Sequence, residues 1–182
     1  MIRTKRSFPV ANTRRHLEPG PIVLISSAWK GKTNIMTLGW HGMIAYDQVI
    51  TYIWDANHSY DMIRGSEQCV INVPTADMIE TVVGIGNCHG TRLDKFKKFD
   101  LTAIDASKVD APLIGECYAS FECRLADDSL IEERGLFIWD VVKAHVAPTP
   151  KNPKKIHYRG DGQFMLGGKA VDMKQRFKAT NL

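Results

Sequence analysis

The sequence lacks the features that mark membrane, secreted and disulfide-stapled proteins. No run of about 18 consecutive apolar residues is present, so we predict no transmembrane helix and no membrane partner. The start, MIRTKRSFPV, is positively charged but is followed by no apolar segment, unlike a secretory signal. The four cysteines include no CxxC pair, which argues against a zinc ribbon and a disulfide scaffold. We therefore expect a cytoplasmic protein with free thiols.

Motifs of several common enzyme classes are also missing. The chain has no GxGxxG after a predicted strand, no P-loop, no HExxH and no GxSxG. Gly84-Ile85-Gly86 follows a predicted helix rather than a strand, which argues against a Rossmann fold. Cys88 and His89 alone are too few ligands for a metal, so we predict no metal site. Any nucleotide must therefore be held in another way.

Basic and acidic residues are nearly balanced, and the mild basic excess lies near the two ends of the chain. The net charge is +4, from 24 basic and 20 acidic residues. Solvated termini explain this pattern, and the alternative is attraction of an anionic partner such as a nucleotide phosphate or an acidic redox protein. Because no nucleic-acid motif accompanies the charges, we predict no DNA or RNA partner. The basic residues at the ends are Arg3, Lys5, Arg6, Arg14, Arg15, Lys151, Lys154, Lys155, Lys169, Lys174, Arg176 and Lys178.

The chain does contain an ordinary globular composition and many short apolar segments. Its 182 residues, 44% hydrophobic and 24% charged, predict one domain over residues 1–182, with a core at about 20–165 and polar extensions at both ends. Lys30-Gly31-Lys32 is typical of a tight turn between two strands. Strands are predicted at 21–29, 33–40, 49–54, 69–73, 112–126 and 135–147.

Short helices are predicted between these strands. Ser59 is expected to cap one helix, which Gly65 ends, and Thr75 is expected to cap another over 76–83. The glycines of 84–90 argue against regular helix there.

A charged helical turn is predicted at 94–98, and the tail from Lys169 is predicted to be helical or disordered. The strands are not each followed by a long helix. An antiparallel barrel, closed or partly open, is therefore favoured over a doubly wound parallel sheet.

Two segments in the first half are candidates for ligand binding. Gly39 lets a ligand or a second backbone approach closely, and Trp40 forms either core or the wall of a pocket for a flat ring. Asn57-His58-Ser59-Tyr60 stands where a strand gives way to a helix, so it is either a plain cap or an anion site.

Two further candidates lie in the second half. The polar loop 87–96 is either ordinary surface or a set of donors that grip a ring edge or a phosphate. His157 and Tyr158 precede a glycine-bearing turn, which either closes the barrel or brings both side chains to a pocket edge.

Taken in order, these segments resemble the flavin reductase-like FMN-binding split-barrel family, especially its flavoredoxin-like branch. Each match is weak alone, and their order over roughly residues 20–165 makes the resemblance specific. The matching segments are Pro21–Ser27, Asn34–His41, Asn57–Ile63, Cys69–Pro74, Asp94–Phe96, Ala111–Ile114, Glu122–Cys123 and His157–Tyr158.

The resemblance implies a mainly β fold, a six-stranded antiparallel Greek-key split barrel with short helices, paired as a homodimer. It implies FMN as cofactor, with the ring beside 36–40, the phosphate or ribityl chain near 57–60, and the loop 88–90 as a cover. Asn72 would support the site from the neighbouring strand. His157 and Tyr158, near the end of the chain, would contribute to it from the second subunit. The implied cofactor-binding residues are Met36, Thr37, Leu38, Gly39, Trp40, Asn57, His58, Ser59, Tyr60, Asn72, Cys88, His89, Gly90, Lys95, His157 and Tyr158.

Three positions depart from the family pattern. Relatives often carry a basic residue where this chain has Asn57, a Pro-Pro pair where it has 45–48, and Ser-Gly where it has Cys88-His89-Gly90. The first difference bears on phosphate binding, and the second on the shape of the loop.

The resemblance implies a flavin reductase-like oxidoreductase that passes electrons from NAD(P)H through FMN to a flavin, a metal complex or a protein. Because the cofactor carries the redox chemistry, we expect no catalytic side chain. The alternatives are a non-enzymatic FMN electron carrier with a redox-protein donor, a split barrel for another cofactor such as haem or an oxidised B6 vitamer, and a barrel without cofactor.

Overall fold

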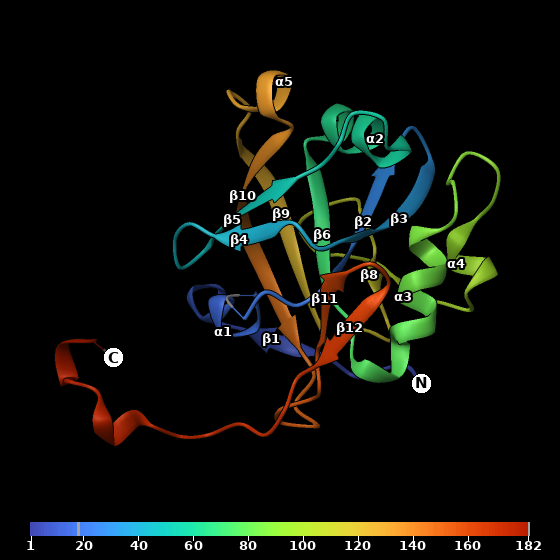
Figure 1. The fold of residues 1–182 in the computed structure, drawn as a ribbon. Helices are drawn as coiled ribbons and strands as arrows, with labels where there is room; N and C mark the ends of the chain where they lie inside the picture. Colours follow the sequence, from blue (N-terminus) through green and yellow to red (C-terminus); the bar gives the residue numbers. More distant parts are fainter. Residues whose placement is uncertain (18, 182) are drawn as a thin grey trace.

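The computed structural model describes residues 1–17 and 19–181 (Figure 1). Within this part of the chain no helix is long and apolar enough to cross a membrane. The strands are β1 (Arg6–Phe8), β2 (Val23–Trp29), β3 (Lys32–Leu38), β4 (His41–Met43), β5 (Gln48–Tyr52), β6 (Gln68–Val73), β7 (Ala103–Ile104), β8 (Leu113–Ile114), β9 (Ala119–Asp127), β10 (Leu136–Val146), β11 (Ile156–Gly160) and β12 (Gln163–Leu166). The α-helices are α1 (Arg14–Leu17), α2 (His58–Ser66), α3 (Ile79–Gly86), α4 (Lys95–Lys98) and α5 (Ile131–Arg134), and 3-10 turns lie at Val10–Asn12, Ala76–Met78, Lys174–Arg176 and Ala179–Asn181.

One curled antiparallel sheet forms the body of the molecule. Its order is β3-β2-β6-β9-β10-β5-β4, and β1 also pairs with β10. Strand β9 follows one side of β10, whereas β5 pairs with its first half and β1 with its end. Register shifts on β10 mark bulges, which bend a strand and increase its twist. The sheet therefore curls into a half-barrel, as predicted, but it has eight strands rather than six.

The extra strands are short and polar, which is why sequence periodicity did not reveal them. Arg6, Ser7 and Phe8 of β1 pair with Val146, His145 and Ala144, although this segment was expected to be a polar extension. Leu17 of α1 is buried in the main core. The chain before residue 20 therefore contributes to the barrel as well as extending from it.

The hairpin between β2 and β3 has the predicted tight turn. Lys30 and Gly31 both have positive φ, of 50° and 74°, as a two-residue type I′ turn requires. Trp29 then pairs with Lys32, and the register continues to Val23 opposite Leu38.

Strand β9 is the centre of the sheet, and here two predictions were wrong. The segment 112–126 is not one long strand, because β8 ends at Ile114 and a turn separates it from β9. The alternation of buried and exposed positions also fails, since Ser120 and Glu122 are as fully buried as their neighbours. Both faces of this strand are covered, so a polar side chain there needs partners inside the protein.

Glu122 obtains those partners from the loop before β8 and from β10. Its carboxylate accepts hydrogen bonds from Ser107 and Lys108, and His145 Nε2 lies 2.6 Å from it. Burial alone would raise the pKa of Glu122, but the hydrogen bonds from His145, Ser107 and Lys108 hold this pKa below its ordinary value. The ionised carboxylate thus fastens the loop to the sheet.

We expect Glu122→Gln to lower the free energy of unfolding by about 1–3 kcal/mol at pH 7, because an amide replaces a charged acceptor. A carboxyl group with a lowered pKa in the folded state stabilises above its unfolded pKa, and this stabilisation is lost as the pH falls through the folded pKa. The difference between wild type and variant in urea denaturation should therefore shrink toward pH 4. A difference of equal size at pH 4 and pH 7 would contradict this account.

The helix boundaries differ from prediction in three places. Asn57, not Ser59, precedes α2, and this helix ends at Ser66, not at Gly65. Helix α3 includes Gly84 and ends at Gly86, although 84–90 was predicted to exclude helix. A Cβ at Gly84 would lie 2.5 Å from the ring of Phe99, so this glycine serves close packing rather than helix breaking.

Thr75 makes no capping hydrogen bond, and its hydroxyl donates to Asp77 instead. The chain therefore enters α3 through the 3-10 turn at Ala76–Met78 rather than through a capped first turn.

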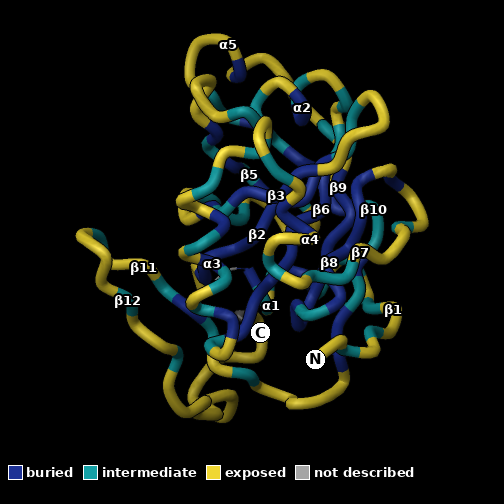
Figure 2. The backbone as a smooth tube through the Cα atoms, turned by 90° about the vertical axis from the view of Figure 1, so that its right-hand side faces the viewer, coloured by how far each residue is buried: buried dark blue, intermediate teal, exposed yellow. Residues whose placement is uncertain are grey.

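The core lies inside the curl of the sheet, and helices α3 and α4 close one side of it (Figure 2). Phe137 and Trp139 of β10 stack with ring centroids 5.5 Å apart, and Trp139 Nε1 donates to Thr51 Oγ1 at 2.9 Å. The hairpin of β11 and β12 is anchored in the core at Ile156, whereas its tip and the tail after it are largely exposed (Figure 2).

Candidate functional site

A cavity of about 220 Å³ lies between β3, the N-terminus of α2 and the loop that joins α3 to α4. It brings together nine of the sixteen predicted site residues. They are Met36, Thr37, Asn57, His58, Ser59, Cys88, His89, Gly90 and Lys95, and the cavity is also lined by Asn34, Ile85, Gly86 and Asn87.

Asn34 of β3 has the most informative side chain in this cavity. It is only 3% exposed, and its Nδ2 donates to Ser59 Oγ at 2.9 Å. Its Oδ1 is buried and has no hydrogen-bond partner in the described part of the chain. Leaving a buried acceptor unpaired costs about 1–3 kcal/mol, and such groups in native proteins usually have a partner. Asn34 Oδ1 is therefore a candidate acceptor for a hydrogen-bond donor of a ligand.

The N-terminus of α2 gives the cavity an anion-binding character. The helix has nine residues, and Asn57 before it forms no side-chain cap. The first-turn N–H groups of a helix have no intrahelical partner, and with the helix dipole they favour a negative group. Ser59 does not cap the helix, because its hydroxyl faces Asn34 instead.

Lys95 brings a buried amine to the opposite wall. Its Nζ donates to Ile35 O at 2.8 Å and to Ile85 O at 3.2 Å, so it ties α4 to β3 and to the end of α3. Burial lowers the pKa of Lys95, and Cys88 opposes this effect. Two of its hydrogen bonds are thus committed to the backbone, and its charge adds to the positive character of the cavity.

The loop over the cavity contains Cys88, His89 and Gly90. Lys98 Nζ lies 3.2 Å from Cys88 Sγ, and His89 Nδ1 lies 3.2 Å from Thr91 Oγ1. The His89 ring stands 6.1 Å from that of His58. A Cβ at Gly90 would lie 2.4 Å from Asn34 Oδ1, so only glycine fits there without displacing Asn34.

The other predicted site residues on the first strands and α2 do not line the cavity. Leu38 belongs to the main core, and Gly39 packs against Ile22. Trp40 is 70% exposed, and its ring packs against that of Tyr52. Tyr60 packs against Phe137 on another side of α2.

Asn72 is fully buried and bonded on every side within the sheet. It is not among the residues that line the cavity, and its amide links β2, β6, β8 and β9.

His157 and Tyr158 also lie outside this cavity. His157 Nδ1 is 3.1 Å from Gly20 O, and His157 lines a different cavity, described below. Tyr158 stacks on Phe164 within the protruding hairpin.

The lining residues that sequence reasoning did not assign have identifiable signals. Asn34 is a polar residue within an otherwise apolar strand, which marks a buried position with a special partner. Ile85, Gly86 and Asn87 line the cavity because α3 runs to Gly86, beyond the predicted end at Val83.

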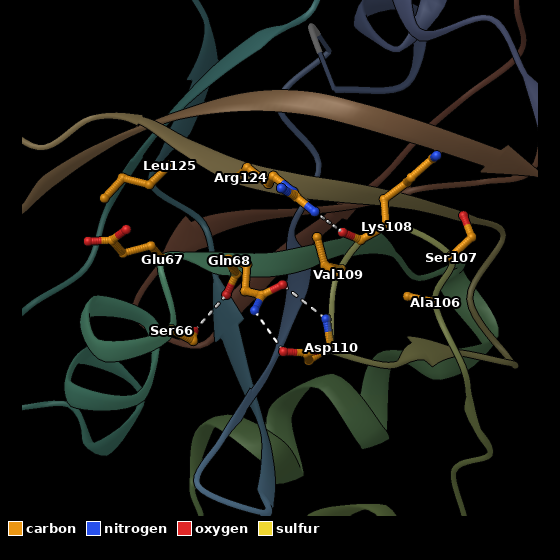
Figure 3. Close-up of a pocket in the computed structure, with 10 residues that line it drawn as sticks. All are labelled: Ser66, Glu67, Gln68, Ala106, Ser107, Lys108, Val109, Asp110, Arg124 and Leu125. Atoms are coloured by element: carbon orange, nitrogen blue, oxygen red, sulfur yellow. Dashed lines mark hydrogen bonds between the residues drawn. The ribbon is translucent and has the colours of Figure 1, made fainter.

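A second polar cavity, of about 560 Å³, lies where β6 and β9 meet the loop before β8 (Figure 3). Its polar groups bond to one another: Gln68 Nε2 donates to Asp110 Oδ2, Asp110 N donates to Gln68 Oε1, and Arg124 donates to Lys108 O. None of the predicted site residues lines it. Because these polar groups already have partners, it makes a weaker ligand site than the cavity at Asn34.

The fold defines a class of protein, the split β-barrel, here with a cavity at its helical edge. The chain belongs to the family of the flavin reductase like domain, whose model matches residues 14–164. The predicted membership and the predicted fold class are therefore confirmed.

Known proteins agree with this assignment. The structure of an FMN-binding domain of a flavin reductases-like enzyme from Shewanella baltica superposes with a TM-score of 0.87 at 20% identity, covering 96% of this chain and 100% of that one. Flavoredoxin of Desulfovibrio vulgaris gives 0.78 at 21% identity, covering 88% and 92%. A protein of Archaeoglobus fulgidus is 27% identical over 135 residues, which cover 73% of this chain and 76% of its own.

Proposed function

We propose that this chain binds FMN in the cavity at Asn34 and acts as a flavin reductase-like oxidoreductase. The observation that carries the proposal is the buried, unpaired Oδ1 of Asn34, beside an uncapped helix N-terminus. A flavin mononucleotide offers hydrogen-bond donors and a phosphate within one molecule, which is the pair of groups this cavity lacks. The structures named above are described as an FMN-binding domain and a flavoredoxin, which supports the choice.

The residues present fit such a cofactor. The first turn of α2, with Asn57, His58 and Ser59, would hold the phosphate. Asn34 and the backbone of 86–90 would contact the polar parts of the flavin, and the Lys95 charge would favour its anionic groups. The bound flavin supplies the hydride and electron chemistry, and these residues bind it and orient it.

Pairing with a second copy would complete this site. Ligand pockets usually measure about 300–1,000 Å³, so a cavity of about 220 Å³ in one chain encloses only part of a cofactor. Three large aromatic side chains on or beside β4 and β5 are exposed in the single chain: Trp40, Tyr46 and Trp54. We propose a homodimer in which exposed aromatic residues, Trp40 and Tyr158 among them, approach the partner's cofactor.

Replacing Ser59 with alanine is expected to weaken FMN binding about tenfold. The Asn34 amide would lose the acceptor that orients it, and one lost hydrogen bond of about 1.4 kcal/mol corresponds to a tenfold change in Kd. Fluorescence titration of FMN into the apoprotein measures the effect. Ser129→Ala, on the loop between β9 and α5, is the matched control and should bind as the wild type does. Equal binding by both variants would contradict the placement.

We further propose NAD(P)H as the electron donor and a flavin, metal complex or protein as the acceptor. Anaerobic mixing of the FMN-loaded protein with NADH or NADPH is expected to bleach the flavin absorption. If neither nicotinamide reduces the protein while a reduced redox protein does, the donor assignment is wrong and the chain acts as an electron carrier instead.

A further inference from the structure

Strand β1 and α1 lie near the loop that follows β10, at the other end of the barrel (Figure 1). A cavity of about 700 Å³ opens among these segments. Its volume falls within the usual range for small-molecule sites. It shares no lining residue with the cavity at Asn34. Its lining combines four basic residues with the aromatic residues Phe8, His16 and Tyr118.

Four cationic side chains converge on this cavity: Arg6, Arg15, Lys151 and Lys155. Among its described lining residues there is no aspartate or glutamate. In the part of the chain that the structure describes, none of the four forms an ion pair with a carboxylate. Like charges gathered without counter-charges raise the positive potential inside a cavity, and they attract an anion to it.

The inner wall is aromatic, with its rings packed edge to face. The ring of His16 lies 5.3 Å from that of Phe8 and 5.7 Å from that of Tyr118. Burial, together with the charges of Lys155 and Arg15, lowers the pKa of His16 to about 4, so this ring is neutral at pH 7. It therefore extends the apolar wall rather than adding a fifth cation.

Lys155 links the aromatic wall to the segment that carries the basic side chains. Its Nζ donates to His16 O at 3.2 Å, which holds the segment after the proline loop against α1. The Tyr118 hydroxyl donates to Lys151 O at 3.2 Å and fixes the other side of that segment. These two hydrogen bonds hold the basic side chains and the aromatic wall next to each other. A ligand that carries both a ring and a negative charge can contact both.

We propose that this cavity is a binding site for a phosphorylated nucleoside, separate from the FMN site. The guanidinium groups of Arg6 and Arg15 suit a phosphate, which they bind through paired N–H donors. The partly exposed rings of Phe8 and His16 suit contact with a base, and the buried Tyr118 packs behind His16. Four of the basic residues near the ends of the chain thereby receive a specific role. The inference does not depend on FMN, since no residue is shared between the two sites.

The test uses AMP as probe and the full chain saturated with FMN, so that the first cavity is filled. Isothermal titration is expected to show one AMP per chain, and Arg15→Ala combined with Lys151→Ala should raise the Kd at least tenfold. Both side chains are exposed, so the substitutions leave the core intact. Lys97→Ala combined with Arg134→Ala removes the same charge from exposed positions outside this cavity and should change the Kd less than twofold.

Inorganic phosphate, which cannot use the aromatic wall, is expected to bind at least tenfold more weakly than AMP. Phosphate binding as tight as that of AMP would overturn the nucleoside part of the proposal. No AMP binding, or AMP binding that responds equally to both double variants, would overturn the site. A chain that fails to take up FMN would refute the proposed function while this titration, repeated without FMN, still decides the second site.

Discussion

Asn72→Ala is expected to lower the free energy of unfolding by about 3–5 kcal/mol, the largest stability effect of any polar substitution in the chain. Asn72 Oδ1 accepts hydrogen bonds from Ile114 N at 3.0 Å and Ser120 Oγ at 2.8 Å, and its Nδ2 donates to Leu24 O and Ser26 Oγ. Each buried group left unpaired costs about 1–3 kcal/mol, and the lost side-chain volume adds to this.

Thermal unfolding followed by circular dichroism measures the effect, and a loss of about 10 °C in Tm is expected for a domain of this size. Asn152→Ala, at an exposed position on the loop before β11, is the matched control and should shift Tm by less than about 2 °C. A small shift for Asn72→Ala would mean that the network linking the four strands does not stabilise the barrel.

Gly90→Val is expected to weaken FMN binding at least 100-fold, a loss of about 2.7 kcal/mol. A Cβ at Gly90 would lie 2.4 Å from Asn34 Oδ1 and 2.7 Å from its Cγ. Asn34 is buried and bonded to Ser59, so either its amide is forced out of place or the loop 86–90 lifts from the cavity. Both responses remove contacts proposed for the cofactor, while the fold away from the cavity is unchanged.

The control for this variant is Gly168→Val, because a Cβ at Gly168 meets nothing within 4 Å. Equilibrium dialysis against FMN should give a Kd close to that of the wild type for Gly168→Val. For Gly90→Val it should give a Kd at least 100-fold higher. If Gly90→Val binds FMN as tightly as the control does, the cofactor does not lie at Asn34.

The fold was predictable where apolar patterning is strong. The β2–β3 hairpin, β5, β6 and β10 are dense in β-branched and aromatic residues, and Lys30-Gly31 marks the turn. The pattern failed for β1, whose three residues are paired only through the end of β10. It also failed at Gly84, where a glycine indicates packing against Phe99 rather than the end of a helix.

The sequence predicted which segments surround the candidate cavity, but not which of their side chains line it. The segments 36–40, 57–60 and 88–90 all contribute to the cavity, yet the strand turns Leu38 into the core and leaves Trp40 in solvent. Asn72 was expected to support the cofactor, but the hydrogen bonds of its amide link β2, β6, β8 and β9. Such outcomes depend on tertiary contacts between residues 25 to 48 positions apart, which no local pattern contains.

The most direct test of the central claim is the absorption spectrum of the purified protein, combined with mass spectrometry of what heat releases from it. We expect the absorption bands of an oxidised flavin and the mass of FMN. A colourless protein that takes up no added FMN, or the spectrum of haem or pyridoxal phosphate, would contradict it.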